Sequence, residues 1–427
     1  MTQSVKKYLP NLLIILALII AYMMSNAIWS FDSASYYRVD MKRFPMYTLW
    51  LRGWEFISTN HYKEFIVIAQ VILGGLAIGT IFKTLQRVIK WSWHSDYLLL
   101  IPLLLPYFPP LLTAHNLTSE GLAYPLYLWM INYFIQFIVS NKRSHLLLTL
   151  VIFLTLCFTR GQFIIVGPTF AVVYALYARN KKFKKTVVAL NFLLLALSPI
   201  ASKIIDASYH KAVHGFFVTT PYSYVNISTL PLYVAKASDS ISIPDKHAKH
   251  LFTSSYITID SLGLTHQQAT GTLEESYMVF HNNFPVICNQ NFHKKARDYF
   301  EHIDNTPHYS SIPAEQTAKT LTYILITNNW KTYLAIYWEG VKHGFTSIYI
   351  LIFLLIVSIY GFIKFIKNPN KKHTFILLSG LLLFSNALIV GLACHSIQRY
   401  LFYNYVLATL MCLLLFNPKP NVNEYRT

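Results

Sequence analysis

Carboxylates and guanidinium groups recur at the edges of the long apolar stretches of this sequence. Asp32 and Arg399 each lie beside an apolar stretch, Glu120 begins another, and Arg160 interrupts one. A carboxylate can take the proton of an attacking hydroxyl. Arginines can stabilise the charge that develops on a phosphate leaving group through planar, two-pronged hydrogen bonds. These residue types therefore suit a site that moves a group from a phosphate to a hydroxyl.

Each of these residues also has a structural interpretation. Asp32 could cap a helix that starts at Ser33. Glu120 could be a first-turn acid that complements the helix dipole. Arg160 and Arg399 could reach lipid phosphates while their stems lie along apolar surface. Taken one residue at a time, these alternatives stay open.

The composition identifies the elements that must position these residues. Of the 427 residues, 54% are hydrophobic and 13% are charged, whereas soluble domains carry about 25% charged residues. Apolar stretches near 20 residues are long enough to cross a bilayer as helices. We expect spans at 9–29, 64–82, 97–112, 120–139, 185–205, 347–366, 374–393 and 399–416, and two shorter helices within 145–177. The predicted fold is an all-α polytopic membrane protein with about ten transmembrane helices.

The distribution of positive charge predicts the orientation. Alternate loops place half of the 36 Lys and Arg residues on one side, in short segments that include 83–90, 142–143, 179–185 and 364–372. Cytoplasmic loops carry this excess, so we expect both termini in the cytoplasm. The net charge of +18 is thereby explained without a nucleic-acid partner. The first apolar stretch also fits a cleavable signal peptide, which would leave the remaining topology unchanged.

Two long segments face outward in this topology. The first, 30–63, is a loop inside the N-terminal membrane region 1–205. The second, 206–346, is long enough to be a domain of its own, and we expect mixed secondary structure there. Residues 347–427 form the last transmembrane helices and a short cytoplasmic tail. An aromatic stripe from Trp330 to Trp338 favours a helix lying on the membrane surface over a substrate groove.

The four charged residues then fall at similar depth on the outer side of the membrane. Five segments around them resemble, in order, short elements of the GT-C glycosyltransferases, the group that includes aminoarabinose and mannosyl transferases. The segments are Asp32-Ser33-Ala34-Ser35-Tyr36, Arg43-Phe44-Pro45-Met46-Tyr47-Thr48-Leu49, Ser119-Glu120-Gly121-Leu122, Thr159-Arg160-Gly161-Gln162 and Arg399-Tyr400-Leu401. Thr48 and Gly161 stand where the family often has Pro. The resemblance covers roughly 9–205 and 330–416.

The resemblance implies roles for individual residues. Asp32 would be the catalytic base, and Glu120 would support it or bind the acceptor or a metal. Arg160, Arg399 and Arg43 would hold the lipid phosphate. The candidates for the substrate pocket are Tyr36, Tyr47, His395 and Tyr400. Members of the family differ in metal use, so a divalent metal stays open and no other cofactor is expected.

The function implied is inverting sugar transfer from a polyprenyl-phosphate donor at the outer face of a bacterial inner membrane. The acceptor would be a glycan, a lipid or a protein. A polymerase or ligase of lipid-linked polysaccharide would also use outward loops and arginines, but it would not require Asp32. A secondary transporter would place polar groups near the bilayer midplane and often contains a repeat. The predicted spans are apolar at mid-depth and no repeat is visible, which disfavours a transporter.

Overall fold

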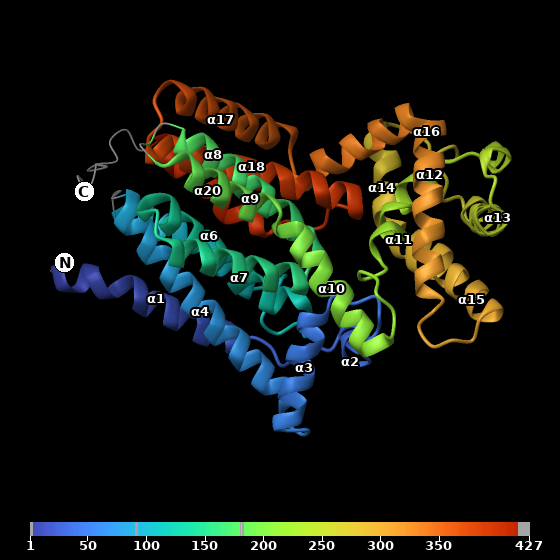
Figure 1. The fold of residues 1–427 in the computed structure, drawn as a ribbon, viewed down its shortest axis with the longest axis horizontal. Coiled ribbons are helices and arrows are strands. Elements are labelled where there is room, and N and C mark those ends of the chain that lie inside the picture. The colour runs from blue at the N-terminus through green and yellow to red at the C-terminus, as the bar shows by residue number, and fades with distance from the viewer. Residues whose placement is uncertain (1–2, 90–92, 180, 182, 417–427) are drawn as a thin grey trace.

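The computed structural model describes residues 3–89, 93–179, 181 and 183–416. Within these ranges, every regular element is a helix. Figure 1 shows the long helices of the N- and C-terminal regions packed together, with the helices α11 to α16 set apart at one end. Lys90, Lys182, Lys419, Arg426 and the predicted C-terminal tail lie outside the described residues.

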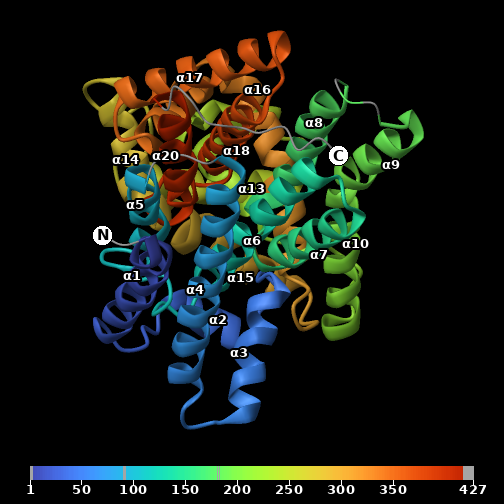
Figure 2. The same cartoon turned by 90° about the vertical axis from the view of Figure 1, so that its left-hand side faces the viewer.

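The helices of the larger part come from both ends of the chain. They are α1 (Gln3–Met23), α2 (Phe31–Tyr37), α3 (Pro45–Ile57), α4 (Tyr62–Ile89), α5 (Trp93–Leu104), η1 (Leu105–Tyr107), α6 (Ser119–Ser140), α7 (Arg143–Thr159), η2 (Gly161–Ile165), α8 (Val166–Ala178), α9 (Lys185–Ala196), α10 (Ser198–His214), α17 (Ile348–Lys367), α18 (Lys371–Ala393), α19 (Gln398–Leu401) and α20 (Tyr403–Phe416). Figure 2 shows α3 and α4 side by side, joined by a short loop.

Five helical segments in the described ranges are long and apolar enough to cross a membrane. They are Tyr62–Ile89, Ser119–Ser140, Gly161–Ala178, Ile348–Lys367 and Lys371–Ala393. The pair α9 and α10, bent by 41°, makes a sixth if it is one span. Their length and composition identify a multi-pass membrane protein.

Several predicted spans are shorter or more broken than the sequence indicated. Apolar helices of 10–17 residues occupy Tyr8–Met23 and Tyr403–Phe416. The two helices expected within 145–177 are present as Arg143–Thr159 and Gly161–Ala178, with the break at Arg160. The stretch 97–112 is helical only to Tyr107. Pro109 and Pro110 follow, and proline cannot donate the backbone hydrogen bond that continues a helix. Arg399 belongs to the short α19, which precedes α20.

The segment between α10 and α17 has a hydrophobic core of its own, with buried residues from Val225 to Ile336. Its helices are α11 (Ser223–Ile227), α12 (Thr229–Val234), η3 (Ala237–Ser242), α13 (Lys246–Ser261), α14 (Leu273–Pro285), η4 (Val286–His293), α15 (Lys294–Ile303) and α16 (Ser311–Gly344). The expectation of mixed secondary structure is wrong for this domain, because its described residues form helices only. Buried Leu251, Ser255 and Ile259 follow the spacing of one helix face.

Helix α16 joins this domain, which we call the outer domain after its predicted position, to α17. Its backbone leaves helical geometry at Asn329, so two helices meet there. After the kink, Trp330, Leu334 and Trp338 repeat every four residues and are about half exposed (53%, 50% and 46%). Ile336 is buried on the opposite side. An exposed aromatic face next to a membrane-spanning helix suits the predicted position on the membrane surface.

Candidate functional site

Five charged residues predicted from the sequence meet in one place, which we call the charged cluster: Asp32, Arg43, Glu120, Arg160 and Arg399. Asp32 Oδ1 accepts a hydrogen bond from Arg43 Nη2 at 2.6 Å, and Oδ2 lies 2.8 Å from Arg399 Nη1. Glu120 Oε1 lies 2.7 Å from Arg160 Nη1. Arg399 also donates to both oxygens of Glu120. Arg399 therefore bridges the two carboxylates.

A short backbone bridge brings α2 and α6 together. The N–H of Ile28 donates to the carbonyl of His115 at 2.8 Å, and the N–H of Leu117 donates to the carbonyl of Ile28 at 3.0 Å. These bonds lie just before α2 and α6. They hold the first turns of the two helices, and so Asp32 and Glu120, near one another.

Ser30, not Asp32, caps α2. The hydroxyl of Ser30 accepts from the N–H of Ser33, and the hydroxyl of Ser33 accepts from the N–H of Ser30 at 2.9 Å. The alternative that Asp32 caps a helix starting at Ser33 is therefore wrong, because the reciprocal serine pair already fills that position. Asp32 lies in the first turn with its carboxylate free to meet the arginines.

Glu120 does lie in the first turn of α6, as the helix-dipole interpretation requires. Its side chain is only 2% exposed, and Arg160 is 12% exposed. A snorkelling arginine would have its guanidinium in the lipid headgroups, whereas Arg160 turns inward to Glu120 and to Ser119 Oγ at 3.0 Å. Arg160 and Glu120 thus form a buried ion pair, beyond the lipid contact and the dipole role that each could have alone.

The break between α7 and η2 packs tightly against the first outer loop. A Cβ on Gly161 would lie 2.5 Å from Cζ of Phe44. Only glycine therefore allows the two segments to approach this closely without a shift. This contact places Arg160 beside the loop that carries Arg43.

Two predicted tyrosines, Tyr36 and Tyr400, lie against the charged cluster, and a third, Tyr47, packs on Tyr36. Tyr36 donates to Ser119 Oγ at 3.0 Å, and its ring lies 4.8 Å from the Arg43 guanidinium carbon. Tyr47 packs edge-on against Tyr36 with ring centroids 5.0 Å apart. The Arg160 guanidinium carbon lies 5.0 Å from the ring of Tyr400. These contacts are cation–π and aromatic interactions that orient the guanidiniums.

His395 belongs to a different group, which we call the histidine cluster: His281, His343 and His395. The ring of His281 lies 4.6 Å from that of His343 and 4.7 Å from that of His395. His395 also stacks on Phe284 at 4.6 Å. The structure thus places His395 against the outer domain rather than on the arginines.

Two amides behind the arginines were missed as functional candidates. Gln162 Oε1 accepts from Arg160 Nε at 3.2 Å and Nη2 at 3.1 Å. Gln162 Nε2 donates to Asn386 Oδ1 at 3.2 Å. Gln162 was noted only as part of a motif, and Asn386 was not singled out. A polar residue inside the apolar stretch 374–393 is the signal that could have identified Asn386.

The electrostatics of the charged cluster favour an anion. Burial raises the pKa of the Asp32 carboxyl, but Arg43 and Arg399 outweigh burial and hold this pKa below its ordinary value. Asp32 is therefore ionised at neutral pH and able to accept a proton. Three arginines face two carboxylates, so the cluster carries one formal positive charge in excess.

The residues of the charged cluster do not fit a divalent metal. Asp32 and Glu120 are each paired with two guanidiniums, whose positive charges compete with a cation. Among the described residues, no group of three or more His, Cys, Asp or Glu side chains is arranged to hold a metal ion.

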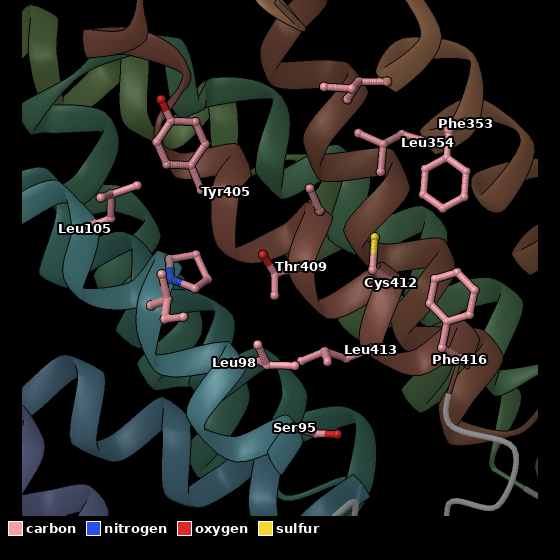
Figure 3. A pocket seen from close by; sticks show the side chains of 14 residues that line it. Ser95, Leu98, Leu105, Phe353, Leu354, Tyr405, Thr409, Cys412, Leu413 and Phe416 are labelled. Atoms are coloured by element: carbon pink, nitrogen blue, oxygen red, sulfur yellow. The ribbon is translucent and has the colours of Figure 1, made fainter.

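A cavity of about 1110 Å³ lies between α5, α17 and α20. Figure 3 shows its apolar lining, with Leu105 and Tyr405 toward one end and Ser95 and Phe416 toward the other. α20 follows α19, which carries Arg399. One of the helices that line the cavity, α20, therefore follows Arg399 closely in the sequence. The cavity runs along apolar helices.

No protein-family model matches the chain, and neither a curated protein nor a solved structure is detectably similar to it.

Proposed function

We propose that this protein is an inverting glycosyltransferase that takes a sugar from a polyprenyl-phosphate donor at the outer face of a bacterial inner membrane. The observation that carries the proposal is the meeting of Asp32 and Glu120 with three arginines at the ends of α2, α6, α7 and α19. A donor whose phosphate is attached to lipid presents it at this level of the bilayer, so no nucleotide-binding element is needed.

Asp32 is the general base in this mechanism. The acceptor hydroxyl attacks the anomeric carbon and gives its proton to Asp32. The bond from that carbon to the phosphate oxygen breaks, and its electron pair leaves with the polyprenyl phosphate. Arg43, Arg160 and Arg399 stabilise the negative charge on this leaving group. Direct attack inverts the anomeric configuration.

Binding of the donor would also tune the base. In the structure both oxygens of Asp32 are held by guanidiniums, from Arg43 and Arg399. A phosphate that draws Arg399 away removes one positive charge from Asp32 and so raises its proton affinity. The base would therefore become stronger only when the donor is in place.

The isoprenoid chain of the donor needs apolar surface. The cavity between α5, α17 and α20 offers it along the length of the helices, lined by residues such as Leu98, Phe353 and Leu413. Burial of a long hydrocarbon chain there would anchor the donor while its phosphate reaches the arginines.

The test is turnover by the purified protein in lipid vesicles. Undecaprenyl-phosphate sugars with a radiolabelled sugar are supplied with candidate acceptors, and transfer of the label to the acceptor is measured. We expect transfer that depends on Asp32. A matched control is Glu55→Gln, since Glu55 lies on the same outer loop but pairs with Arg52. Growth of a polysaccharide chain in the Asp32→Asn variant would favour the polymerase or ligase instead.

The orientation and the ten spans are part of the proposal. A reporter fused after Arg143 or Lys184 should be cytoplasmic, and one inserted near Lys246 should be external. The reason is the excess of Lys and Arg in the loops at 142–143 and 179–185. An external report from the fusion after Lys184 would overturn the number of spans.

A further inference from the structure

Two amide side chains, Gln162 and Asn386, lie directly behind the arginines of the charged cluster. Gln162 is in η2, and Asn386 is in the apolar helix α18 with 6% of its surface exposed. A buried amide in a membrane-spanning helix is costly unless its polar atoms have partners. Here the two amides bond to each other and to neighbouring polar groups, which compensates their burial. The hydrogen bonds continue from Gln162 to Arg160.

Arg160 determines which atom donates and which accepts in each hydrogen bond of this group. A guanidinium has donors only, so Gln162 Oε1 must face it, at 3.2 and 3.1 Å. Gln162 Nε2 is then the donor to Asn386 Oδ1 and to the Tyr400 carbonyl at 3.3 Å. Asn386 Nδ2 in turn donates to the Tyr400 carbonyl at 3.3 Å and to Asn404 Oδ1 at 3.2 Å. We call Gln162, Asn386 and Asn404 the amide relay.

The amide relay supports both arginines that hold Glu120. Gln162 binds the Nε–Nη2 edge of Arg160, which leaves Nη1 to meet Glu120 at 2.7 Å. The carbonyl of Tyr400, which accepts from both amides, belongs to the residue next to Arg399. One network thus fixes the rear of the Arg160 guanidinium and also holds the backbone next to Arg399.

We propose that Gln162 and Asn386 are positioning residues that set the orientation of Arg160 for the phosphate of the lipid donor. The inference rests on the proposed function. A planar guanidinium binds a phosphate through two parallel N–H groups, so its orientation decides how many of them reach the ligand. The amides act through Arg160 and need not contact the donor.

The test measures the affinity of the full-length protein for undecaprenyl phosphate in lipid nanodiscs. Asn386→Leu should weaken binding about tenfold, the loss expected when a charge-assisted contact is misplaced. The matched control is Asn191→Leu. Asn191 is likewise a buried asparagine in an apolar helix, but it donates to Tyr174 at 2.9 Å. The control should bind like the unmodified protein.

A double-mutant cycle separates positioning from general packing. In an Arg160→Ala background, Asn386→Leu should cost much less affinity than in the unmodified protein, because the group it positions is gone. Equal losses in both backgrounds would overturn the inference. If Asn386→Leu does not fold, Gln162→Met carries the same cycle, since it keeps the side-chain size and removes both hydrogen-bonding atoms.

The outcomes also separate this inference from the proposed function. Binding by the unmodified protein together with undiminished binding by Asn386→Leu or Gln162→Met would overturn the positioning role alone. No binding of undecaprenyl phosphate by the unmodified protein would overturn both.

Discussion

The charged cluster and the histidine cluster lie near the junction of the membrane helices with the outer domain. The buried groups of the first keep their charge, whereas those of the second lose it. In the charged cluster, Asp32 and Glu120 keep their charges because each is paired with two guanidiniums. In the histidine cluster, three imidazoles pack ring against ring. Burial, and after it the neighbouring histidines, lowers the pKa of His281 and of His395 to about 4.

The two clusters show how burial affects ionisable groups at this junction. A buried charge is tolerated when a partner of opposite sign is within hydrogen-bonding distance, and otherwise the group loses its charge. The charged cluster is thereby prepared to exchange its internal pairs for an anion. The histidine cluster is neutral at neutral pH and acts as packing between α14, α16 and the segment before α19.

The largest expected effect comes from Asp32→Asn. The change keeps size and hydrogen-bonding shape but removes the ability to accept a proton. Loss of a general base lowers rates by about 10²–10⁴-fold, so kcat for sugar transfer should fall by this factor. Affinity for undecaprenyl phosphate should survive.

The structure makes this prediction sharper than the sequence did. Ser30 caps α2, so Asp32→Asn removes no helix cap. Asp32 is more exposed than Glu120 (27% against 2%), so the loss of its ion pairs should destabilise the fold less than Glu120→Gln does. Glu55→Gln on the same loop should leave kcat unchanged. Transfer at a near-normal rate by Asp32→Asn would remove Asp32 from the mechanism.

Glu120→Gln should be the most destabilising change in the charged cluster. The carboxylate lies between Arg160 and Arg399 and is 2% exposed. Removing one partner of a buried ion pair typically costs about 3–5 kcal/mol, because the other charge is left uncompensated. Thermal unfolding in detergent or nanodiscs measures the loss. A melting temperature equal to that of Glu55→Gln would mean that the buried pair does not stabilise the fold.

Arg399→Ala should weaken binding of undecaprenyl phosphate by about 1.5–3 kcal/mol, the usual contribution of a hydrogen bond to a charged group. Arg399→Lys should recover only part of this loss, because lysine has a point charge without the planar fork. Binding is measured in nanodiscs at fixed salt. Unchanged affinity in Arg399→Ala would assign this residue to holding the carboxylates or contacting lipid.

The charged residues could be identified from the sequence, but the way they pair could not. Arg160 and Glu120 were identifiable because charge at the edge of an apolar stretch is rare and costly. Their pairing could not be predicted, because it depends on the bridge from Ile28 to His115 and Leu117 and on the close contact at Gly161. These contacts join segments far apart in the chain, and no local pattern encodes them.

The same limit explains where the structure differs from expectation. His395 is a candidate for the substrate pocket because it lies four positions before Arg399, and the structure places its ring against Phe284. The outer domain was expected to be mixed because its polar, Tyr- and Thr-rich start obscures helical spacing. Asn386 was overlooked because one amide in a long apolar stretch does not alter the prediction of a span.

The histidine cluster provides the smallest expected effect, and it concerns pH. The folded protein holds the pKa of His281 and His395 at about 4, whereas an unfolded chain has histidines near 6.5. Between these values the unfolded state binds more protons than the folded state. This contribution to stability is therefore complete above about pH 6.5 and is lost progressively as the pH falls toward 4.

The change that isolates this effect is His281→Phe, which keeps an aromatic ring in the cluster and removes one titrating group. The melting temperature of the unmodified protein should fall more steeply from pH 7 to pH 5 than that of His281→Phe. His214 and His293 also have lowered pKa values, and Glu274 favours the charged form of His343, so only the difference between the two proteins is informative. His302→Phe, at an exposed position on α15, should keep the slope of the unmodified protein. Parallel slopes for His281→Phe and the unmodified protein would show that the histidine cluster is not held neutral by burial, and the contrast with the charged cluster would fail.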